Sequence, residues 1–256
     1  MHLSPRQTDI LTRARDMGRV TVDGLAAEFH VTAQTIRRDL GSLCDAGLLE
    51  RTHGGAAMAE GLTNLAYMDR RRMNAEAKDA IGRAAARLVH PGNSVFLNIG
   101  TTTEAVARHL REVPNITVIT NNLNVAQILS GHATAEVIVT SGRLRRSDGA
   151  LVGELAVQTL RHFKPDLAMI GTSAIDHKGV LLDYDPDEIR VTHAILEQTG
   201  LPVLVADQGK FQRTAPVRVT NITRMRYWVT DRAPTSMMQT LCRGAYVRMF
   251  TPAGEL

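Results

Sequence analysis

The 256-residue sequence predicts an α/β protein of two domains: a small helical domain with a β-hairpin, then a larger domain built on a parallel sheet. Two observations carry this prediction. In the first 58 residues, apolar residues recur at helical spacing, and a segment follows in which apolar and polar residues alternate before a turn of two glycines. From residue 75 onward, short apolar runs typical of strands alternate with helical stretches. We therefore expect domains at residues 1–58 and 75–256, joined by a linker at 59–74.

The composition is that of an ordinary globular protein, with 44% hydrophobic and 22% charged residues. No apolar run approaches the ~18 residues that span a bilayer, and the first ten residues lack the apolar region of a signal peptide. Cys44 and Cys242 occur in no metal or redox spacing. We expect a cytoplasmic protein with no membrane contact, no metal and no cofactor.

Three helices are predicted in the first domain from their capping residues. Ser4 and Gln7 can form a capping box, and the intervening proline suits the first helical position. Thr21 and Thr32 can each cap a further helix through the side-chain hydroxyl. The apolar spacing after each cap supports all three helices.

The third helix presents polar side chains opposite its buried stripe. At 100° per residue, Ile36, Leu40 and Leu43 share one face. The opposite face carries an amide and a guanidinium group, which match the major-groove edges of adenine and guanine. The flanks carry groups suited to backbone phosphates. The expected DNA contacts from this helix are Thr32, Gln34, Thr35, Arg37 and Arg38.

A small β-wing is predicted after Gly47, because residues 48–56 alternate and then turn on two glycines. His53, Gly54 and Gly55 at this turn are the expected wing contacts to DNA. The alternative is a protein-interaction module whose adjacent arginines form a solvated face. The first 58 residues hold seven arginines and seven acidic residues, so their net charge does not decide between the two.

The second domain alternates strands with helices. Expected strands are Val95–Ile99, Ile116–Thr120, Glu136–Thr140, Leu167–Ile170, Val203–Ala206 and Tyr227–Thr230; expected helices are Thr103–Leu110, Leu123–Ser130, Leu151–His162 and Glu188–Thr199. This order predicts a parallel sheet covered on both faces, with ligands at the carboxyl ends of the strands. The absence of GxGxxG and P-loop motifs disfavours dinucleotides and nucleoside triphosphates.

Small polar residues follow three of these strands. They are Gly100, Thr101, Thr102 and Thr103 after the first, Asn121 and Asn122 after the second, and Gly171 and Thr172 after the fourth. Backbone N–H groups at a helix N-terminus, together with threonine hydroxyls, make an anion site. Plain helix capping is the alternative for the first turn. Three such turns at one sheet edge favour a small phosphorylated ligand.

Charged residues are expected at the same edge. Lys210 suits a phosphate as a point charge, with a solvated loop lysine as the alternative. Four acids occupy residues 183–188, and a capping box with Asp185 as N-cap and Glu188 at N3 explains two or three of them. Asp183 and Asp176 remain as acceptors for ligand hydroxyls.

Residues 35–40 and 47–56 together resemble the DNA-binding domain of the DeoR family of bacterial repressors. The resemblance implies a winged helix-turn-helix with its recognition helix near residues 33–46. A helix-turn-helix usually reads DNA as a symmetric dimer, so we expect a homodimer or homotetramer.

The resemblance continues through residues 100–102, 120–121, 171–179 and 207–211, which are similar to the DeoR-type sensor domain. That domain is related in fold to ribose-5-phosphate isomerase and binds phosphorylated sugars or polyols. The chain departs from the family at Asn98, where the strand often ends in aspartate.

Residues 120–126, 148–154 and 181–190 are most similar to the branch of the family that governs glycerol-3-phosphate metabolism. This implies a transcriptional repressor, not an enzyme, that is induced by glycerol-3-phosphate. One alternative keeps the repressor but exchanges the effector for fructose-1-phosphate or deoxyribose-5-phosphate. Another is a sugar-phosphate isomerase with Asp176, Asp183 and Lys210 as acid/base groups.

Overall fold

The computed structural model describes residues 3–17, 19–58 and 67–256, so the expected linker at 59–74 lies outside the described residues over 59–66. The chain divides into two compact units, Met1–Arg72 and Met73–Leu256. Residues 67–72, at the end of the first unit, are helical.

Up to residue 58, the described part of the first unit combines helices with a small antiparallel sheet of strand order β1-β3-β2. Its elements are α1 (Pro5–Met17), β1 (Arg19–Thr21), α2 (Val22–Glu28), α3 (Ala33–Asp45), β2 (Leu49–Thr52) and β3 (Gly55–Met58). The capping box is confirmed, because the Gln7 amide N–H donates to the Ser4 hydroxyl and the Ser4 N–H donates to the Gln7 side chain. Thr21 and Thr32 cap α2 and α3 as predicted.

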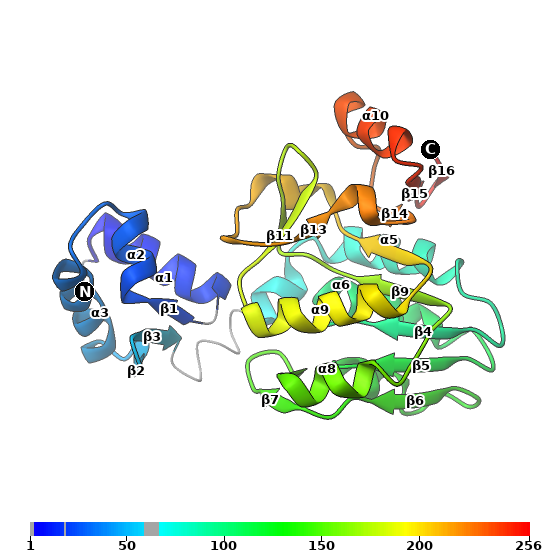
Figure 1. Ribbon diagram of the computed structural model, residues 1–256, viewed down its shortest axis with the longest axis horizontal. Helices are drawn as coiled ribbons and strands as arrows, with labels where there is room; N and C mark the ends of the chain where they lie inside the picture. The colour runs from blue at the N-terminus through cyan, green and yellow to red at the C-terminus, as the bar shows by residue number, and fades with distance from the viewer. Residues whose placement is uncertain (1–2, 18, 59–66) are drawn as a thin grey trace. The chain divides into compact units, whose positions relative to one another are not determined.

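The second unit is a three-layer α/β domain (Figure 1). Its sheet has the order β16-β15-β14-β12-β9-β4-β5-β6, in which every strand is parallel to its neighbours except β16. The strands are β4 (Ser94–Leu97), β5 (Thr117–Thr120), β6 (Glu136–Val139), β9 (Leu167–Ile170), β12 (Pro202–Val205), β14 (Tyr227–Val229), β15 (Arg248–Thr251) and β16 (Gly254–Glu255). The helices are α5 (Ala75–Ala86), α6 (Thr101–Leu110), α7 (Leu123–Leu129), α8 (Glu154–Leu160), α9 (Pro186–Gln198) and α10 (Ser236–Gly244).

Successive residues of the central strands face opposite sides of the sheet. Phe96 belongs to a core with α8, α9 and α10, whereas Val95 and Leu97 belong to a core with α5, α6 and α7. The predicted parallel sheet covered on both faces is therefore confirmed. Among the helices that the structure describes, none is both long and apolar enough to cross a bilayer.

Two smaller β-structures flank the sheet. One is the hairpin β7 (Arg143–Arg145) and β8 (Ala150–Val152); the other joins β10 (Ala174–Ile175), β11 (Val180–Asp183) and β13 (Val217–Asn221). The helix expected from Leu151 to His162 is therefore wrong at its start. Gly153, with φ +97°, separates strand β8 from helix α8, and an apolar run alone does not distinguish strand from helix.

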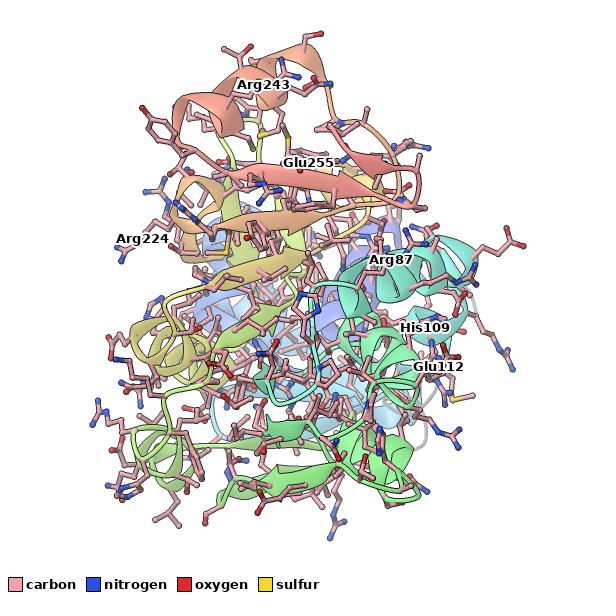
Figure 2. All side chains as sticks on the ribbon, turned by 90° about the vertical axis from the view of Figure 1, so that its right-hand side faces the viewer. Arg87, His109, Glu112, Arg224, Arg243 and Glu255 are labelled. Carbon is pink, nitrogen blue, oxygen red and sulfur yellow. The ribbon has the colours of Figure 1, made fainter. Side chains whose placement is uncertain are left out.

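The topology of the sheet marks its carboxyl edge as the place for a ligand. Figure 2 shows the edge at which the parallel strands begin, where Arg87 and Glu112 follow the last turns of α5 and α6. At the carboxyl edge, the strand order reverses between β4 and its neighbours β5 and β9. Such a switch point opens a crevice where α/β proteins bind ligands.

Candidate functional site

Helix α3 separates its side chains into a buried and an exposed face. Ile36 and Leu43 are fully buried, whereas Gln34, Arg37 and Arg38 are exposed. The hydroxyl of Thr32 accepts a hydrogen bond from the backbone N–H of Thr35 at 3.2 Å, which fixes the first turn of the helix. The exposed face therefore carries the amide and guanidinium groups near the helix N-terminus.

Ion pairing within residues 1–58 explains why their net charge of zero still leaves a basic helix face. The guanidinium of Arg6 donates to Asp39 at 2.6 Å, and Arg13 pairs with Glu28. Within the described part of the chain, Arg37 and Arg38 form no ion pair. Acidic residues thus neutralise arginines that hold the helices together, and those on α3 stay open to an anionic partner.

Asp39 makes a structural contact that sequence reasoning missed. It is 8% exposed and ties α3 to the start of α1 through Arg6, so it sets the orientation of the exposed helix face. Its position three residues after buried Ile36 was the available signal, because that spacing places a charged side chain beside the apolar stripe.

The wing turn consists of His53 and Gly54 between paired Thr52 and Gly55. Gly54 has φ +80°, a conformation that glycine adopts without strain. A Cβ on Gly55 would lie 1.9 Å from the carbonyl oxygen of Val20. Gly55 is therefore required by the packing of β3 against β1, while His53 and Gly54 are exposed.

In the second unit, the turn after β4 leads into the N-terminus of α6. Gly100 has φ +139° and gives no side-chain cap, so the first amides of α6 lack a capping acceptor. Thr103 is fully buried, and its hydroxyl lies 2.7 Å from the carbonyl oxygens of both Asn98 and Gly100. Thr101 and Thr102 make no side-chain hydrogen bond among the described residues. The turn thus offers N–H groups and two hydroxyls.

Asn98, the departure from the family pattern, is buried and bonded on both sides of its amide. Its Nδ2 donates to the hydroxyl of Thr192 at 3.0 Å, and its Oδ1 accepts from the N–H of Ile99 at 2.6 Å. The Asn98 side chain thus links the end of β4 to α9. An ionised aspartate at this position could not donate this hydrogen bond, because it has no N–H.

Two asparagines at the end of β5 carry buried polar atoms without a partner. Asn121 Oδ1 and Asn122 Nδ2 have no hydrogen-bond partner among the described residues, although both side chains are fully buried. Their other amide atoms bond to the carbonyl oxygen of Leu151 and the N–H of Asn124. Unpaired buried polar atoms are costly, and a bound ligand is one way to satisfy them.

In the turn after β9, the hydroxyl of Thr172 bonds the backbone and the hydroxyl of Ser173 bonds the carboxylate of Asp183. The hydroxyl of Thr172 lies 3.0 Å and 2.9 Å from the carbonyl oxygens of Ala174 and Leu182, so it closes the backbone there. Asp183 accepts a hydrogen bond from Ser173 at 2.8 Å. Burial raises the pKa of Asp183, and the nearby charge of Lys210 opposes that shift. Asp183 and Lys210 therefore share one region.

The Asp176 carboxylate is engaged in a backbone turn. It occupies the turn between β10 and β11, where its Oδ1 accepts hydrogen bonds from the N–H groups of Lys178 and Val180, both at 2.8 Å. This arrangement closes a hairpin turn. Among the described residues, Asp176 forms no hydrogen bond or ion pair with the residues of the Gly100 turn.

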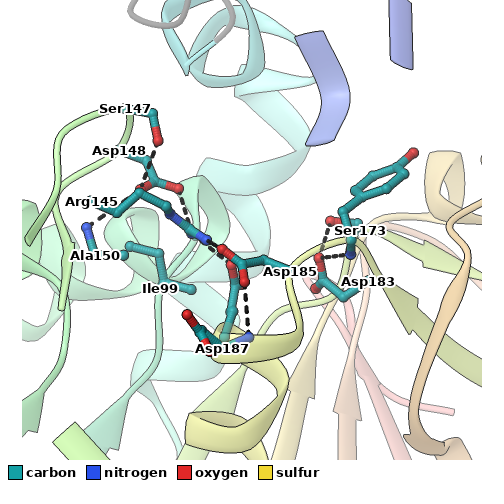
Figure 3. A network of polar contacts seen from close by, with 12 residues as sticks. Ile99, Arg145, Ser147, Asp148, Ala150, Ser173, Asp183, Asp185 and Asp187 are labelled. Atoms are coloured by element: carbon teal, nitrogen blue, oxygen red, sulfur yellow. Dashed lines mark hydrogen bonds and ion pairs between the residues drawn. The ribbon is translucent and has the colours of Figure 1, made fainter. Parts of the chain in front are cut away.

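Arg145, which sequence reasoning missed, is the centre of the acidic cluster (Figure 3). It bonds Asp148 at 2.8 Å, Asp185 at 2.5 Å and Glu188 at 2.6 Å. Asp185 caps α9 as predicted, whereas the side chain of Glu188 bonds Arg145 and does not close the predicted capping box. The signal was available, because the crowded acids at 183–188 require a cation and Arg145 lies between two glycine turns.

This cluster holds more negative charge than Arg145 can neutralise. Burial and the charge of Asp183 raise the pKa of Glu188 to about 8, with the Arg145 charge opposing the shift. The proton affinity of Glu188 is therefore sensitive to any charge that enters the same region.

Comparisons with known proteins place both units. A family model described as "DeoR-like helix-turn-helix domain" matches residues 6–61, and one described as "DeoR C terminal sensor domain" matches residues 73–232. The glycerol-3-phosphate regulon repressor of Escherichia coli K12 is 37% identical over 94% of this chain and 96% of that protein. The transcriptional repressor CsqR of the same strain is 32% identical over 97% and 95%.

A structural likeness is also found to ribose 5-phosphate isomerase A from Methanocaldococcus jannaschii. The TM-score is 0.40 with 14% sequence identity, and the likeness covers 54% of this chain and 55% of the other.

Proposed function

Because the chain belongs to the DeoR family of DNA-binding transcriptional repressors, we propose that it represses genes of glycerol-3-phosphate metabolism and releases DNA when glycerol-3-phosphate binds the second unit. The chain is a regulator and not an enzyme. The observation that supports the effector proposal is that open amides follow β4, unpaired asparagine atoms follow β5 and a lysine follows β12, three parallel strands whose carboxyl ends share one edge of the sheet.

In this proposal the effector phosphate binds the amides after Gly100 and the hydroxyls of Thr101 and Thr102. A helix N-terminus favours an anion through its N–H groups and its dipole. Lys210 adds a positive charge. Asp183 accepts hydrogen bonds from the polyol hydroxyls. The remaining members of the expected set are Thr103, Asn121, Asn122, Gly171 and Thr172; the hydroxyls of Thr103 and Thr172 act by holding the turns.

For DNA, we propose that Gln34 and Arg38 read base edges in the major groove, as their exposure on α3 supports. Thr32, Thr35 and Arg37 contact phosphates, with His53 and Gly54 adding contacts from the wing. A homodimer or homotetramer places two such helices on related half-sites.

Induction requires that glycerol-3-phosphate bind the arrangement of low DNA affinity more tightly than the arrangement of high affinity. A ligand with equal affinity for both would change nothing. Fructose-1-phosphate is the second candidate effector, because the same Gly100 turn would receive its phosphate.

The test is calorimetric titration of the full chain with glycerol-3-phosphate, glycerol and fructose-1-phosphate. We expect glycerol-3-phosphate alone to bind, and Lys210→Met to weaken its binding at least about tenfold, roughly the loss of one charge-assisted bond. Lys178→Met, an exposed lysine in the β10–β11 turn, is the matched control. Binding of fructose-1-phosphate instead would keep the repressor and change its pathway; no binding of any phosphate would contradict the proposed site.

A further inference from the structure

The segment that leads from the DNA-binding unit enters the second unit at Met73 and Asn74. Asn74 has φ +53° and precedes α5 as its N-cap, yet its side chain makes no capping bond to that helix. Instead its Nδ2 donates a hydrogen bond to Oδ1 of Asp207, 133 residues away, at 2.9 Å. The start of the second unit, which follows the first unit in the chain, is thus hydrogen-bonded to the loop after β12.

Asp207 is a buried carboxylate at the start of the Lys210 loop. It is 1% exposed, and its Oδ1 also accepts the N–H of Gly209 at 3.0 Å. Its Oδ2 has no hydrogen-bond partner in the described part of the chain. A buried carboxylate with so few donors depends strongly on each one that it has. The bond from Asn74 is therefore a specific contact and not an incidental surface one.

Close packing reinforces this contact. A Cβ on Gly209 would lie 2.9 Å from Nδ2 of Asn74, so only glycine lets the loop backbone approach the amide this closely. Met73 is held as well: its carbonyl oxygen accepts a hydrogen bond from Nζ of Lys78 at 2.7 Å, and its sulfur contacts the guanidinium of Arg213. Asn74 and the Met73 sulfur, on consecutive residues of this junction, thus both contact residues 207–213.

The loop is short enough to act as a rigid connection. Asp207 caps the 3-10 helix η1 (Gln208–Gln212), and the N–H of Lys210 donates to the carbonyl oxygen of Asp207 at 3.1 Å. This short turn gives a bonded path by which a displacement of Lys210 toward a bound anion would reach Asp207 and the amide of Asn74. Chains of packed and hydrogen-bonded groups of this kind can carry coupling between two sites.

We propose that Asn74 is the positioning residue through which the effector loop controls the chain leading to the DNA-binding unit. This inference rests on the proposed function, since it assumes that an anion engages Lys210. Effector binding shifts the Lys210 loop, the Asn74–Asp207 hydrogen bond passes the shift to the start of α5, and the first unit loses its DNA-competent arrangement. The coupling free energy of the two sites is carried in part by this bond.

The test compares Asn74→Gly with a matched control, Asn115→Gly. Glycine adopts positive φ without strain, so the substitution removes only the side chain. Asn115 also has positive φ, at +55°, and is exposed in the turn between α6 and β5, at the amino edge of the sheet. A DNA duplex selected by the wild-type protein from a random library serves as the operator.

Three quantities are measured for each full-length protein: the Kd for glycerol-3-phosphate by calorimetry, and the Kd for the duplex with and without saturating glycerol-3-phosphate. For the wild type and Asn115→Gly we expect the effector to weaken DNA binding by a factor of roughly 5–150, the usual range of allosteric coupling. For Asn74→Gly we expect the effector Kd to stay within about threefold and the coupling factor to fall toward one.

A failure of the proposed function and a failure of this inference give different results. If wild-type protein does not bind glycerol-3-phosphate or does not respond to it, the proposed function falls and this inference falls with it. If the wild type responds and Asn74→Gly responds equally, only the inference is overturned. Loss of effector binding in Asn74→Gly would also overturn it, because the bond would then serve the pocket itself.

Hydrogen–deuterium exchange on the wild-type protein gives a readout that does not depend on how well the variant folds. We expect glycerol-3-phosphate to change exchange at the amides of residues 75–78, whose first turn begins at Asn74. The exposed turn around Asn115 should not change. Identical exchange at residues 75–78 with and without effector would overturn the inference.

Discussion

Glu188 shows most clearly how a single residue depends on its surroundings. It accepts a hydrogen bond from Arg145 and is buried close to Asp183 and Asp148, and the resulting pKa is about 8. The folded chain therefore binds a proton here between about pH 4.5 and pH 8, where an unfolded glutamate is ionised. Ionising Glu188 in the folded state lowers the free energy of unfolding.

This predicts that stability falls as the pH rises through that window. The contribution of Glu188 reaches at most about 1.4 kcal/mol per pH unit. Glu188→Gln keeps an acceptor for Arg145 and should reduce this slope, as urea unfolding at about pH 5.5 and about pH 7.5 would measure. Glu197→Gln, exposed on the same helix, is the control. An unchanged slope in Glu188→Gln would contradict the assignment.

The residues on the exposed face of α3 give a second prediction. Arg38→Ala should cost about 1–3 kcal/mol of DNA binding and relax specificity at one base pair, because the proposed role of its guanidinium is to read a base edge. Arg37→Ala should weaken binding evenly across sequences and lower the salt slope by about one. Binding measured against a panel of single-base operator variants separates the two. Unchanged base preference in Arg38→Ala would contradict its role.

Helix starts were the elements most predictable from sequence. A capping residue before an apolar stripe is a local signal, so Ser4, Thr21, Thr32 and Asp185 were identified correctly as caps. Strand β1 was missed because its three residues pair with a strand more than thirty positions away. Nothing local marks such pairing.

The candidate site was predictable to the same extent. The position of the polar turns at one edge follows from the parallel sheet. Which atom each threonine hydroxyl bonds cannot be predicted from the sequence. Thr103 and Thr172 look like ligand donors in the sequence, yet their hydroxyls bond backbone carbonyls. Arg145 and Asp39 escaped notice because their partners lie on other elements.

Packing between β1 and β3 gives a prediction for these elements. Gly55→Ala places a Cβ 1.9 Å from the carbonyl oxygen of Val20, so we expect the first unit to lose about 1–3 kcal/mol or more. Gly41→Ala, on α3, meets only Arg51 at 3.6 Å and should be neutral or stabilising. Thermal unfolding of the two variants checks this. Equal stability of Gly55→Ala and the wild type would contradict the tight approach of the strands.

At the scale of the whole molecule, the proposal requires more than one chain. Two recognition helices must reach related half-sites, so sedimentation equilibrium should give a mass at least twice the 28.0 kDa of the chain. A monomer that still binds its operator tightly would contradict the symmetric arrangement.

The central claim is that a phosphorylated polyol bound at the carboxyl edge of the second unit releases DNA held by the first. The most direct measurement is fluorescence anisotropy of a labelled operator duplex, bound to the full chain and titrated with glycerol-3-phosphate. We expect the anisotropy to fall to the value of free DNA, while glycerol has no effect. A complex that persists at saturating glycerol-3-phosphate, or that glycerol dissociates equally well, would contradict it.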